Sequence, residues 1–195
     1  MKRFNLLGIV CGLWAAMLLS CSTSNPPSIN SQISVAPTPM ASPRMAEVQA
    51  TGWKPLEACG YLSNISGLQT RGYKNQYEDT YGCSSPYKEL GTGSPLANNI
   101  AYYVKGDAEN ATELKLVLNV NAAQQAKEAQ ATLVSHSEEL TKKALGVPMS
   151  KEVRNALSSG KAGQWTLGKS KVEITRDEWT TGKGYELHYI IRKVA

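Results

Sequence analysis

The chain has 195 residues and a formal net charge of +5, from 21 lysines and arginines against 16 aspartates and glutamates. This excess is small and forms no dense basic stripe, so we expect no nucleic-acid partner. The length allows one domain of ordinary size with a proper hydrophobic core, in addition to short terminal segments.

The first twenty residues have the composition of a secretory signal peptide. Met1-Lys2-Arg3 is basic, and an apolar run from Phe4 to Ser20 follows it. At about 17 residues the run is at the short limit for crossing the hydrocarbon core of a membrane. Residues 21–27 also lack the basic flank that stops transfer. We therefore predict that residues 1–20 are a cleaved leader and not a retained membrane-spanning helix.

The predicted leader ends with Leu18-Leu19-Ser20, and Cys21 follows to complete the tetrapeptide Leu18-Leu19-Ser20-Cys21. This tetrapeptide resembles the lipobox of bacterial lipoproteins. The resemblance implies cleavage before Cys21 and acylation of its thiol and amine, for example with palmitate, so that Cys21 anchors the protein to a membrane. In that family an aspartate after the cysteine often means retention in the inner membrane. Because Ser22 stands there, we expect an outer-membrane anchor facing the periplasm if the cell is Gram-negative.

Residues 21–50 are predicted to be a disordered tether behind the lipidated cysteine. They are rich in Ser, Pro, Thr, Asn and Ala, and they hold five of the nine prolines in the chain. Such a composition buries too little apolar surface to offset the entropy of ordering. A flexible coil of this length has an r.m.s. reach of about 30 Å, so the domain can stand off the membrane.

Residues 51–195 are predicted to form a single domain that begins with a short helix over residues 55–65. Residues 71–90 are rich in tyrosine and glycine, which favours one or two short strands and a long turn. The clearest strand covers residues 113–121, where leucine and valine alternate with polar residues. Residues 100–104 alternate in the same way, so the two segments are predicted to form an antiparallel hairpin.

A long helix is predicted next, capped by Asn121 and ended by Gly146. Ser150 is predicted to cap a second short helix that stops at Gly160. Alternating segments near residues 165–167, 172–174 and 185–191 complete the chain with three strands. This order resembles two halves of similar plan, although no residue-level repeat is present.

This order of elements predicts an α+β fold. We expect a mainly antiparallel sheet of about five to seven strands, with one long and two short helices packed on one face.

Two cysteines remain once the leader and the anchor are accounted for. Cys59 and Cys83 would meet an oxidising compartment, where such a pair is expected to form a disulfide. Neither a Cys-x-x-Cys spacing nor nearby histidines are present, so we expect neither a metal-binding nor a reactive pair.

Residues 163–170 match the pattern of a phosphate-binding loop, G-x-x-x-x-G-K-[ST]. Such a loop lies between a buried strand and the N-terminus of a helix. Here the interior residues alternate like a strand, and a further strand follows Ser170. We therefore predict a hairpin turn, with no nucleotide partner and no cofactor.

No catalytic or metal-binding constellation stands out in the sequence. His136 and His188 are far apart, and neither has a carboxylate or cysteine at ligand spacing. We expect each to be a lone polar residue at the surface. No serine lies in a nucleophile elbow.

Four tyrosines, Tyr73, Tyr77, Tyr81 and Tyr87, form a possible binding surface. Amphipathic aromatic side chains stack on sugar rings and anchor protein partners. The alternative is that tyrosine fills the edge of the core, since Phe4 is the only phenylalanine of the chain.

These features predict a membrane-anchored, non-enzymatic envelope lipoprotein whose domain binds a protein, a glycan or another envelope component. Two alternatives stay open: an envelope hydrolase acting on cell-wall material, and a small-molecule-binding module. A deep pocket with converging Asp, His or Glu would favour the hydrolase, and a flat face lined by tyrosine would favour binding. A sizeable apolar cavity between sheet and helices would favour the small-molecule module.

Overall fold

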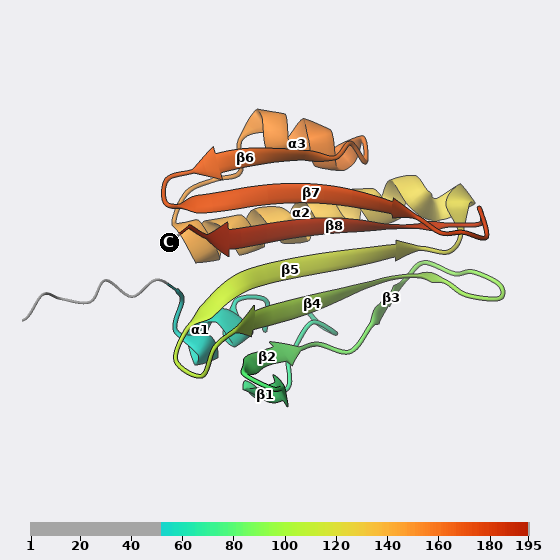
Figure 1. The fold of residues 1–195 in the computed structure, drawn as a ribbon. Helices are drawn as coiled ribbons and strands as arrows, with labels where there is room; N and C mark the ends of the chain where they lie inside the picture. Colours follow the sequence, from blue (N-terminus) through green and yellow to red (C-terminus); the bar gives the residue numbers. More distant parts are fainter. Residues whose placement is uncertain (1–51, 195) are drawn as a thin grey trace, which may run out of the picture. The chain divides into compact units, whose positions relative to one another are not determined.

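An antiparallel β-sheet of eight strands is the framework of the protein in a computed structural model, which describes residues 52–194 (Figure 1). The predicted leader, Cys21 and the tether lie outside the described residues. Seven strands follow the order β1-β2-β4-β5-β8-β7-β6, and β3 pairs with β4. The strands are β1 Lys74–Tyr77, β2 Thr80–Ser84, β3 Lys88–Leu90, β4 Asn98–Gly106, β5 Ala111–Val120, β6 Gly163–Leu167, β7 Ser170–Glu178 and β8 Tyr185–Lys193.

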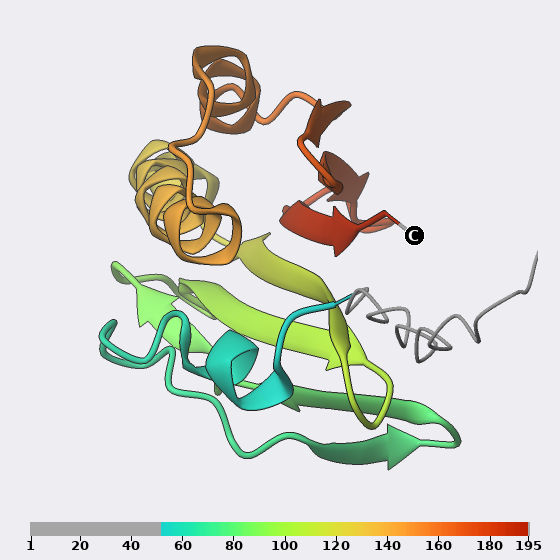
Figure 2. The ribbon, with the colours of Figure 1, turned by 90° about the vertical axis from the view of Figure 1, so that its left-hand side faces the viewer.

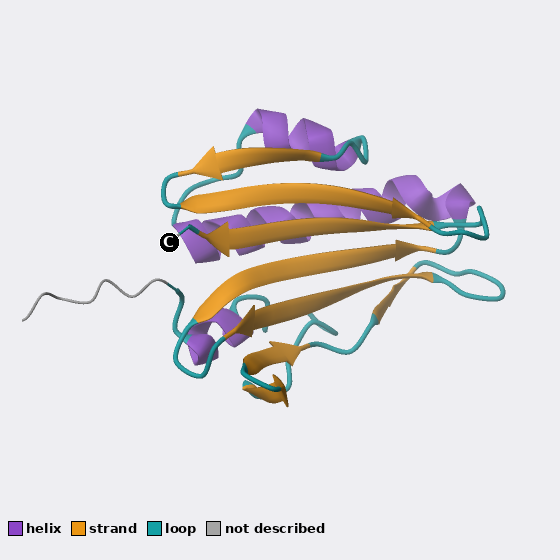
Figure 3. Ribbon diagram, viewed as in Figure 1, coloured by secondary structure: helices purple, strands orange, loops and turns teal. Residues whose placement is uncertain are grey.

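Three helices cover one face of this sheet (Figures 2 and 3). They are α1 Pro55–Gly60, α2 Ala126–Leu145 and α3 Lys151–Ser158. Two buried tyrosines point from the sheet to the helices. The Tyr102 hydroxyl of β4 donates a hydrogen bond to the carbonyl of Ala58 in α1 at 2.8 Å. The Tyr189 hydroxyl of β8 lies 2.6 Å from Thr141 Oγ1 in α2. The predicted α+β fold, with one long and two short helices on one face, is confirmed.

The hydrophobic core lies between the sheet and the helices. The two-residue period of a strand sends alternate side chains to opposite faces, so one face of each long strand is apolar. The side chains on the covered face are buried: Ile100, Tyr102 and Val104 of β4, Leu114, Leu116 and Leu118 of β5, Val172 and Ile174 of β7, and Leu187, Tyr189 and Ile191 of β8. Each large apolar side chain buried in this way contributes about 1.5–3 kcal/mol relative to exposure.

The two halves of the domain meet at the centre of the sheet. Helix α1 precedes the antiparallel series β2-β4-β5, and helices α2 and α3 precede the series β6-β7-β8. The last strands of the two series, β5 and β8, pair antiparallel along their length, from Glu113 opposite Arg192 to Val120 opposite Tyr185. Each half therefore contributes its last strand to the centre of one continuous sheet, and their apolar faces form a common core.

Two helix boundaries differ from the sequence prediction. Helix α1 ends at Gly60 and not near Ile65. The chain continues in turns with i→i+3 backbone bonds, and Ser63 Oγ donates to the Gly60 carbonyl at 2.8 Å. Helix α2 is not capped by Asn121, whose Nδ2 donates instead to the Ala97 carbonyl at 2.7 Å. It begins at Ala126, after a 3₁₀ turn at Ala123–Gln125.

The ends of α2 and α3 follow the prediction. Gly146 has a φ of 70°, the left-handed conformation in which glycine commonly ends a helix. Ser150 Oγ accepts a hydrogen bond from the amide of Val153 and caps α3.

Asn98, at the start of β4, fixes the backbone of residues 121 and 122 between β5 and α2. Its Oδ1 accepts hydrogen bonds from the backbone amides of Asn121 and Ala122, both at 2.8 Å. Its Nδ2 donates to the Ala122 carbonyl at 3.2 Å. The Asn98 side chain is fully buried, and its bonds to Ala122 are shielded from solvent. A buried amide left without a partner costs free energy in the folded state.

We expect Asn98→Ala to lower the free energy of unfolding by about 2–3 kcal/mol, because it leaves two backbone amides unpaired in the interior. Chemical denaturation at neutral pH measures this loss. Asn155→Ala on the exposed side of α3 is the control, and it should change stability by less than about 0.5 kcal/mol. An Asn98→Ala protein that unfolds at the wild-type denaturant concentration would contradict the role assigned to this side chain.

Candidate functional site

The face of the sheet opposite the helices is covered by no helix among residues 52–194. We call it the open face. Paired registers place its side chains in rows across four long strands. They are Asn99, Ala101, Tyr103 and Lys105 of β4, Glu113, Lys115, Val117 and Asn119 of β5, Lys171, Glu173, Thr175 and Asp177 of β7, and Glu186, His188, Ile190 and Arg192 of β8.

An ion-pair network orders one end of the open face. Arg192 Nε lies 2.8 Å from Glu113 Oε2, and the same guanidinium contacts Glu173 through Nη1. Gln164 Nε2 donates to Glu173 at 2.9 Å. The hydrogen bond from Gln164, together with that from Arg192, lowers the pKa of Glu173 below its ordinary value. These three charged groups pair with one another, while Lys105 and Lys171 lie in the same row of the sheet and are exposed.

A first hollow of about 420 Å³ lies on the open face over β1, β2 and β4. Its walls include Tyr77, which is 70% exposed, and Tyr103. The Tyr103 hydroxyl donates to the hydroxyl of Tyr87 at 3.0 Å, and Lys115 Nζ lies 5.5 Å from the centre of the Tyr103 ring. Burial, followed by the bond to Tyr87, raises the pKa of Tyr103 above its ordinary value, so the ring stays neutral at physiological pH.

A second hollow, of about 390 Å³, lies towards the other end of the open face. It is lined by Tyr87, Glu89, Leu96, Asn99, Asn119, Asn121, Trp179 and Glu186. Two of these side chains are large and exposed: Leu96 at 62% and Tyr87 at 58%. The Tyr87 to Tyr103 hydrogen bond joins the walls of the two hollows. We call this second hollow the amide hollow, because three asparagines line it.

The carboxamides of the amide hollow are held in fixed orientations. Asn119 Nδ2 donates to Asn99 Oδ1 at 2.7 Å, and Asn121 Nδ2 donates to the Ala97 carbonyl at 2.7 Å. Trp179 begins the loop between β7 and β8. A Cβ built on Gly184 would lie 2.6 Å from the indole, so Gly184 leaves the space that this ring occupies. The hollow is therefore lined by oriented amides beside an indole and a phenol.

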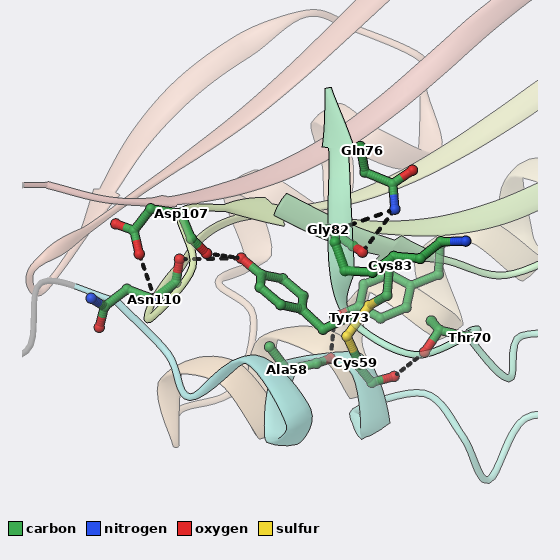
Figure 4. Close-up of a disulfide and its surroundings, with 11 residues drawn as sticks. Ala58, Cys59, Thr70, Tyr73, Gln76, Gly82, Cys83, Asp107 and Asn110 are labelled. Carbon is green, nitrogen blue, oxygen red and sulfur yellow. Dashed lines mark hydrogen bonds between the residues drawn. A yellow bond between two sulfur atoms is a disulfide. The ribbon is translucent and has the colours of Figure 1, made fainter. Parts of the chain in front are cut away.

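The structure divides the four predicted tyrosines between the two faces of the sheet. Tyr73 and Tyr81 lie on the helix side and stack, with ring centres 6.2 Å apart. The Tyr73 hydroxyl donates to the carbonyl of Asp107 at 2.8 Å (Figure 4). Tyr77 and Tyr87 are exposed and line the two hollows. Tyr73 and Tyr81 therefore stabilise the end of the domain, whereas Tyr77 and Tyr87 are available to a partner.

The disulfide between Cys59 and Cys83 is present, as the sequence predicts (Figure 4). It joins α1 to β2, with a Cα to Cα distance of 6.2 Å. Both cysteines are buried. Thr70 Oγ1 donates to the Cys59 carbonyl at 3.0 Å, so the chain after α1 is fixed at the same place.

Both histidines are half-buried, which corrects the expectation of lone surface residues. His188 Nε2 lies 2.9 Å from Glu186 Oε2, and its Nδ1 lies 3.8 Å from Asp177 Oδ2. Asp177 comes from the neighbouring strand β7, so the sequence could not place it beside His188. Glu186 lies two residues before His188 on β8, so the alternation of that strand was a local signal that was missed. His136 lies on α2, where burial of the ring, followed by the charge of Lys88, lowers its pKa below the ordinary 6.5.

We expect the free energy of unfolding to fall as the pH is lowered from 7.5 to 5.5, in part because of His136. Its pKa is lower in the folded state, so the unfolded chain binds more protons in this range and is favoured by acid. The contribution is complete above the unfolded pKa and is lost as the pH falls through the lower folded pKa. Denaturation of wild type and His136→Gln at both pH values measures the difference. An identical pH dependence for the two proteins would contradict the assignment.

The segment that matches a phosphate-binding loop is a hairpin. Residues Gly163–Leu167 form β6, Gly168 turns with a φ of 59°, and β7 begins at Ser170. A strand and not a helix therefore follows the turn, as predicted.

Within the described range, no group of three or more His, Cys, Asp or Glu side chains could hold a metal ion. No helix between residues 52 and 194 is long and apolar enough to cross a membrane. Comparisons with protein-family models, curated proteins and solved structures found no match to this chain. The site therefore has to be interpreted from its own geometry.

Sequence reasoning missed most of the amide hollow. The alternation of residues 113–121 already placed Asn119 and Asn121 opposite the buried leucines, which was the available signal. Their neighbours come from other strands: Asn99 is opposite Asn119 in β4, and Glu186 is opposite it in β8. Only the strand registers bring these residues together.

Proposed function

We propose that this chain is a membrane-anchored envelope lipoprotein whose domain binds another envelope component without catalysing a reaction. Cys21 carries the lipid, and residues 21–50 give the domain reach from the membrane surface. In a Gram-negative cell the anchor lies in the outer membrane and the domain faces the periplasm. The open face is the binding surface.

The observation that carries this proposal is the pair of joined hollows on the one sheet face that the described helices leave uncovered. Exposed large side chains with a polar end are favoured at protein and glycan contacts. Tyr77 and Tyr87 provide such side chains on this face, and Leu96 adds an exposed apolar one. On the covered face the corresponding strand positions are filled by the core.

The hydrolase alternative has its best support in Asp177, Glu186 and His188, which converge at one edge of the amide hollow. Both ring nitrogens of His188 face carboxylates, one at 2.9 Å and the other at 3.8 Å. A general base that activates a nucleophile needs a ring nitrogen directed at that group. No serine or cysteine of residues 52–194 hydrogen-bonds to this ring. The surroundings of His188 therefore do not fit a serine or cysteine hydrolase.

Photo-crosslinking in living cells tests the proposal. A photoreactive amino acid at Tyr77 or Tyr87 should give a discrete crosslinked product, because both positions line the open face. The same amino acid at the exposed positions Lys142 of α2 and Asn155 of α3 is the matched control and should give none. Crosslinks from the helix positions alone would overturn the proposal.

A further inference from the structure

We propose that the amide hollow binds a neutral oligosaccharide of N-acetylhexosamine units. This inference rests on the proposed function and names the chemistry of the ligand at one end of the open face. It is carried by three features of the hollow: the unused hydrogen-bonding groups of its asparagines, the aromatic rings beside them, and its charge.

The asparagine pair lines the hollow and leaves one donor and one acceptor without a partner among the described residues. Asn99 uses its Oδ1 to accept from Asn119, so the Asn99 Nδ2 group has no partner among the described residues. Asn119 uses its Nδ2, so its Oδ1 remains as an acceptor. A secondary amide carries one carbonyl acceptor and one N–H donor. The acetamido group of an N-acetylhexosamine therefore matches this pair group for group.

The side chain of Asn121 adds a third carboxamide to the hollow. Asn121 Nδ2 is bonded to the Ala97 carbonyl at 2.7 Å, which leaves its Oδ1 as a further acceptor. Sugar hydroxyls both donate and accept, so they can bond to amide groups of either kind. Because the internal bonds hold the three carboxamides in place, a ligand loses little free energy in ordering them.

The aromatic and apolar walls suit the flat, weakly polar faces of sugar rings. Trp179 packs over Gly184, which has no side chain to displace it, and Tyr87 is held by its bond to Tyr103. Leu96 is 62% exposed on the same rim and offers a contact for the methyl of an acetamido group. A hollow of about 390 Å³ is within the range of small-molecule sites. The hollow is open to solvent, so an oligosaccharide longer than the hollow can extend beyond it.

The negative charge of the amide hollow disfavours anionic ligands. Glu89 and Glu186 line the hollow, and Asp177 is opposite Glu186 in the sheet register. No lysine or arginine lines it. Phosphorylated or carboxylated ligands would meet like charges here. A neutral sugar is compatible with these carboxylates, and a basic peptide is the competing ligand that the experiment must distinguish.

Isothermal titration of the full mature chain in detergent tests the inference with three probes: a β-linked N-acetylglucosamine tetramer, the matched glucose tetramer and an octalysine peptide. We expect the acetylated tetramer to bind at least about tenfold more tightly than the glucose tetramer, because only it completes the amide match. Asn99→Asp keeps the acceptor for Asn119 and removes the outward donor, so it should weaken this binding by about tenfold.

Three further variants separate a local effect from a change in fold. Trp179→Ala should weaken tetramer binding by about tenfold, and Trp179→Phe should restore part of it. Asn155→Asp adds the same charge on exposed α3 and should leave binding unchanged.

Absence of tetramer binding, or equal binding by wild type and Asn99→Asp, would overturn the inference. Tighter octalysine binding by Asn99→Asp than by wild type, without tetramer binding, would replace the sugar with a basic peptide. The proposed function is judged separately, since crosslinks from Tyr87 that persist without sugar binding would leave it standing.

Discussion

Loss of the Cys59–Cys83 disulfide should lower the free energy of unfolding by about 3 kcal/mol. The bond closes a loop with a sequence separation of 24, and the loop-closure entropy of the unfolded chain sets this magnitude. For a domain of this size the corresponding fall in melting temperature is roughly 10 °C. We expect Cys59→Ala/Cys83→Ala to show this change in thermal and chemical denaturation, with native circular dichroism at low temperature.

Wild-type protein treated with a reductant is the control for this experiment. It should unfold close to the double variant, because both lack the crosslink and differ only by two small buried side chains. The effect should be strongest near α1, which the bond joins to β2. A double variant that melts within about 2 °C of the oxidised protein would contradict the stabilising role of this bond.

Replacement of Cys21 should abolish the membrane attachment of the protein. If the lipobox resemblance holds, the thiol of Cys21 receives a fatty acyl chain, and the amine of the same residue receives another after cleavage. Two acyl chains give stable anchoring where one gives only reversible binding. We expect labelled palmitate to enter wild type and not Cys21→Ala, and the variant to leave the membrane fraction.

Cys11→Ala is the matched control for this labelling. Cys11 lies within the predicted leader and is removed with it, so the substitution should change neither palmitate incorporation nor the membrane fraction. Equal labelling of wild type and Cys21→Ala would contradict the anchor, and the proposed envelope function would lose its basis.

The long elements of the fold were predictable because their sequence patterns are local. The alternation of Leu114, Leu116 and Leu118 predicts β5, and Gly146 and Ser150 mark helix boundaries that the structure confirms. The start of α2 was not predictable in this way. It depends on Asn98, a residue 28 positions before Ala126, which bonds the backbone just after β5.

The candidate site was less predictable than the fold, for a physical reason. A two-residue period shows which side of a strand a residue occupies, but it does not show which residues lie beside it on the next strand. Asn99, Asn119 and Glu186 form one row only because β4, β5 and β8 are adjacent in a particular register. The tyrosine pattern was likewise ambiguous, since Tyr73 and Tyr87 lie on opposite faces of the sheet.

Differential acetylation of lysines tests most directly whether the open face is occupied in the cell. Lys105 and Lys171 lie on this face, and Lys127 and Lys142 lie on α2; all four are exposed. We predict that Lys105 and Lys171 react several-fold more slowly in intact envelopes than in the purified protein, while the rates at Lys127 and Lys142 stay unchanged. Equal rates at all four lysines in the two preparations would contradict a binding function for the open face.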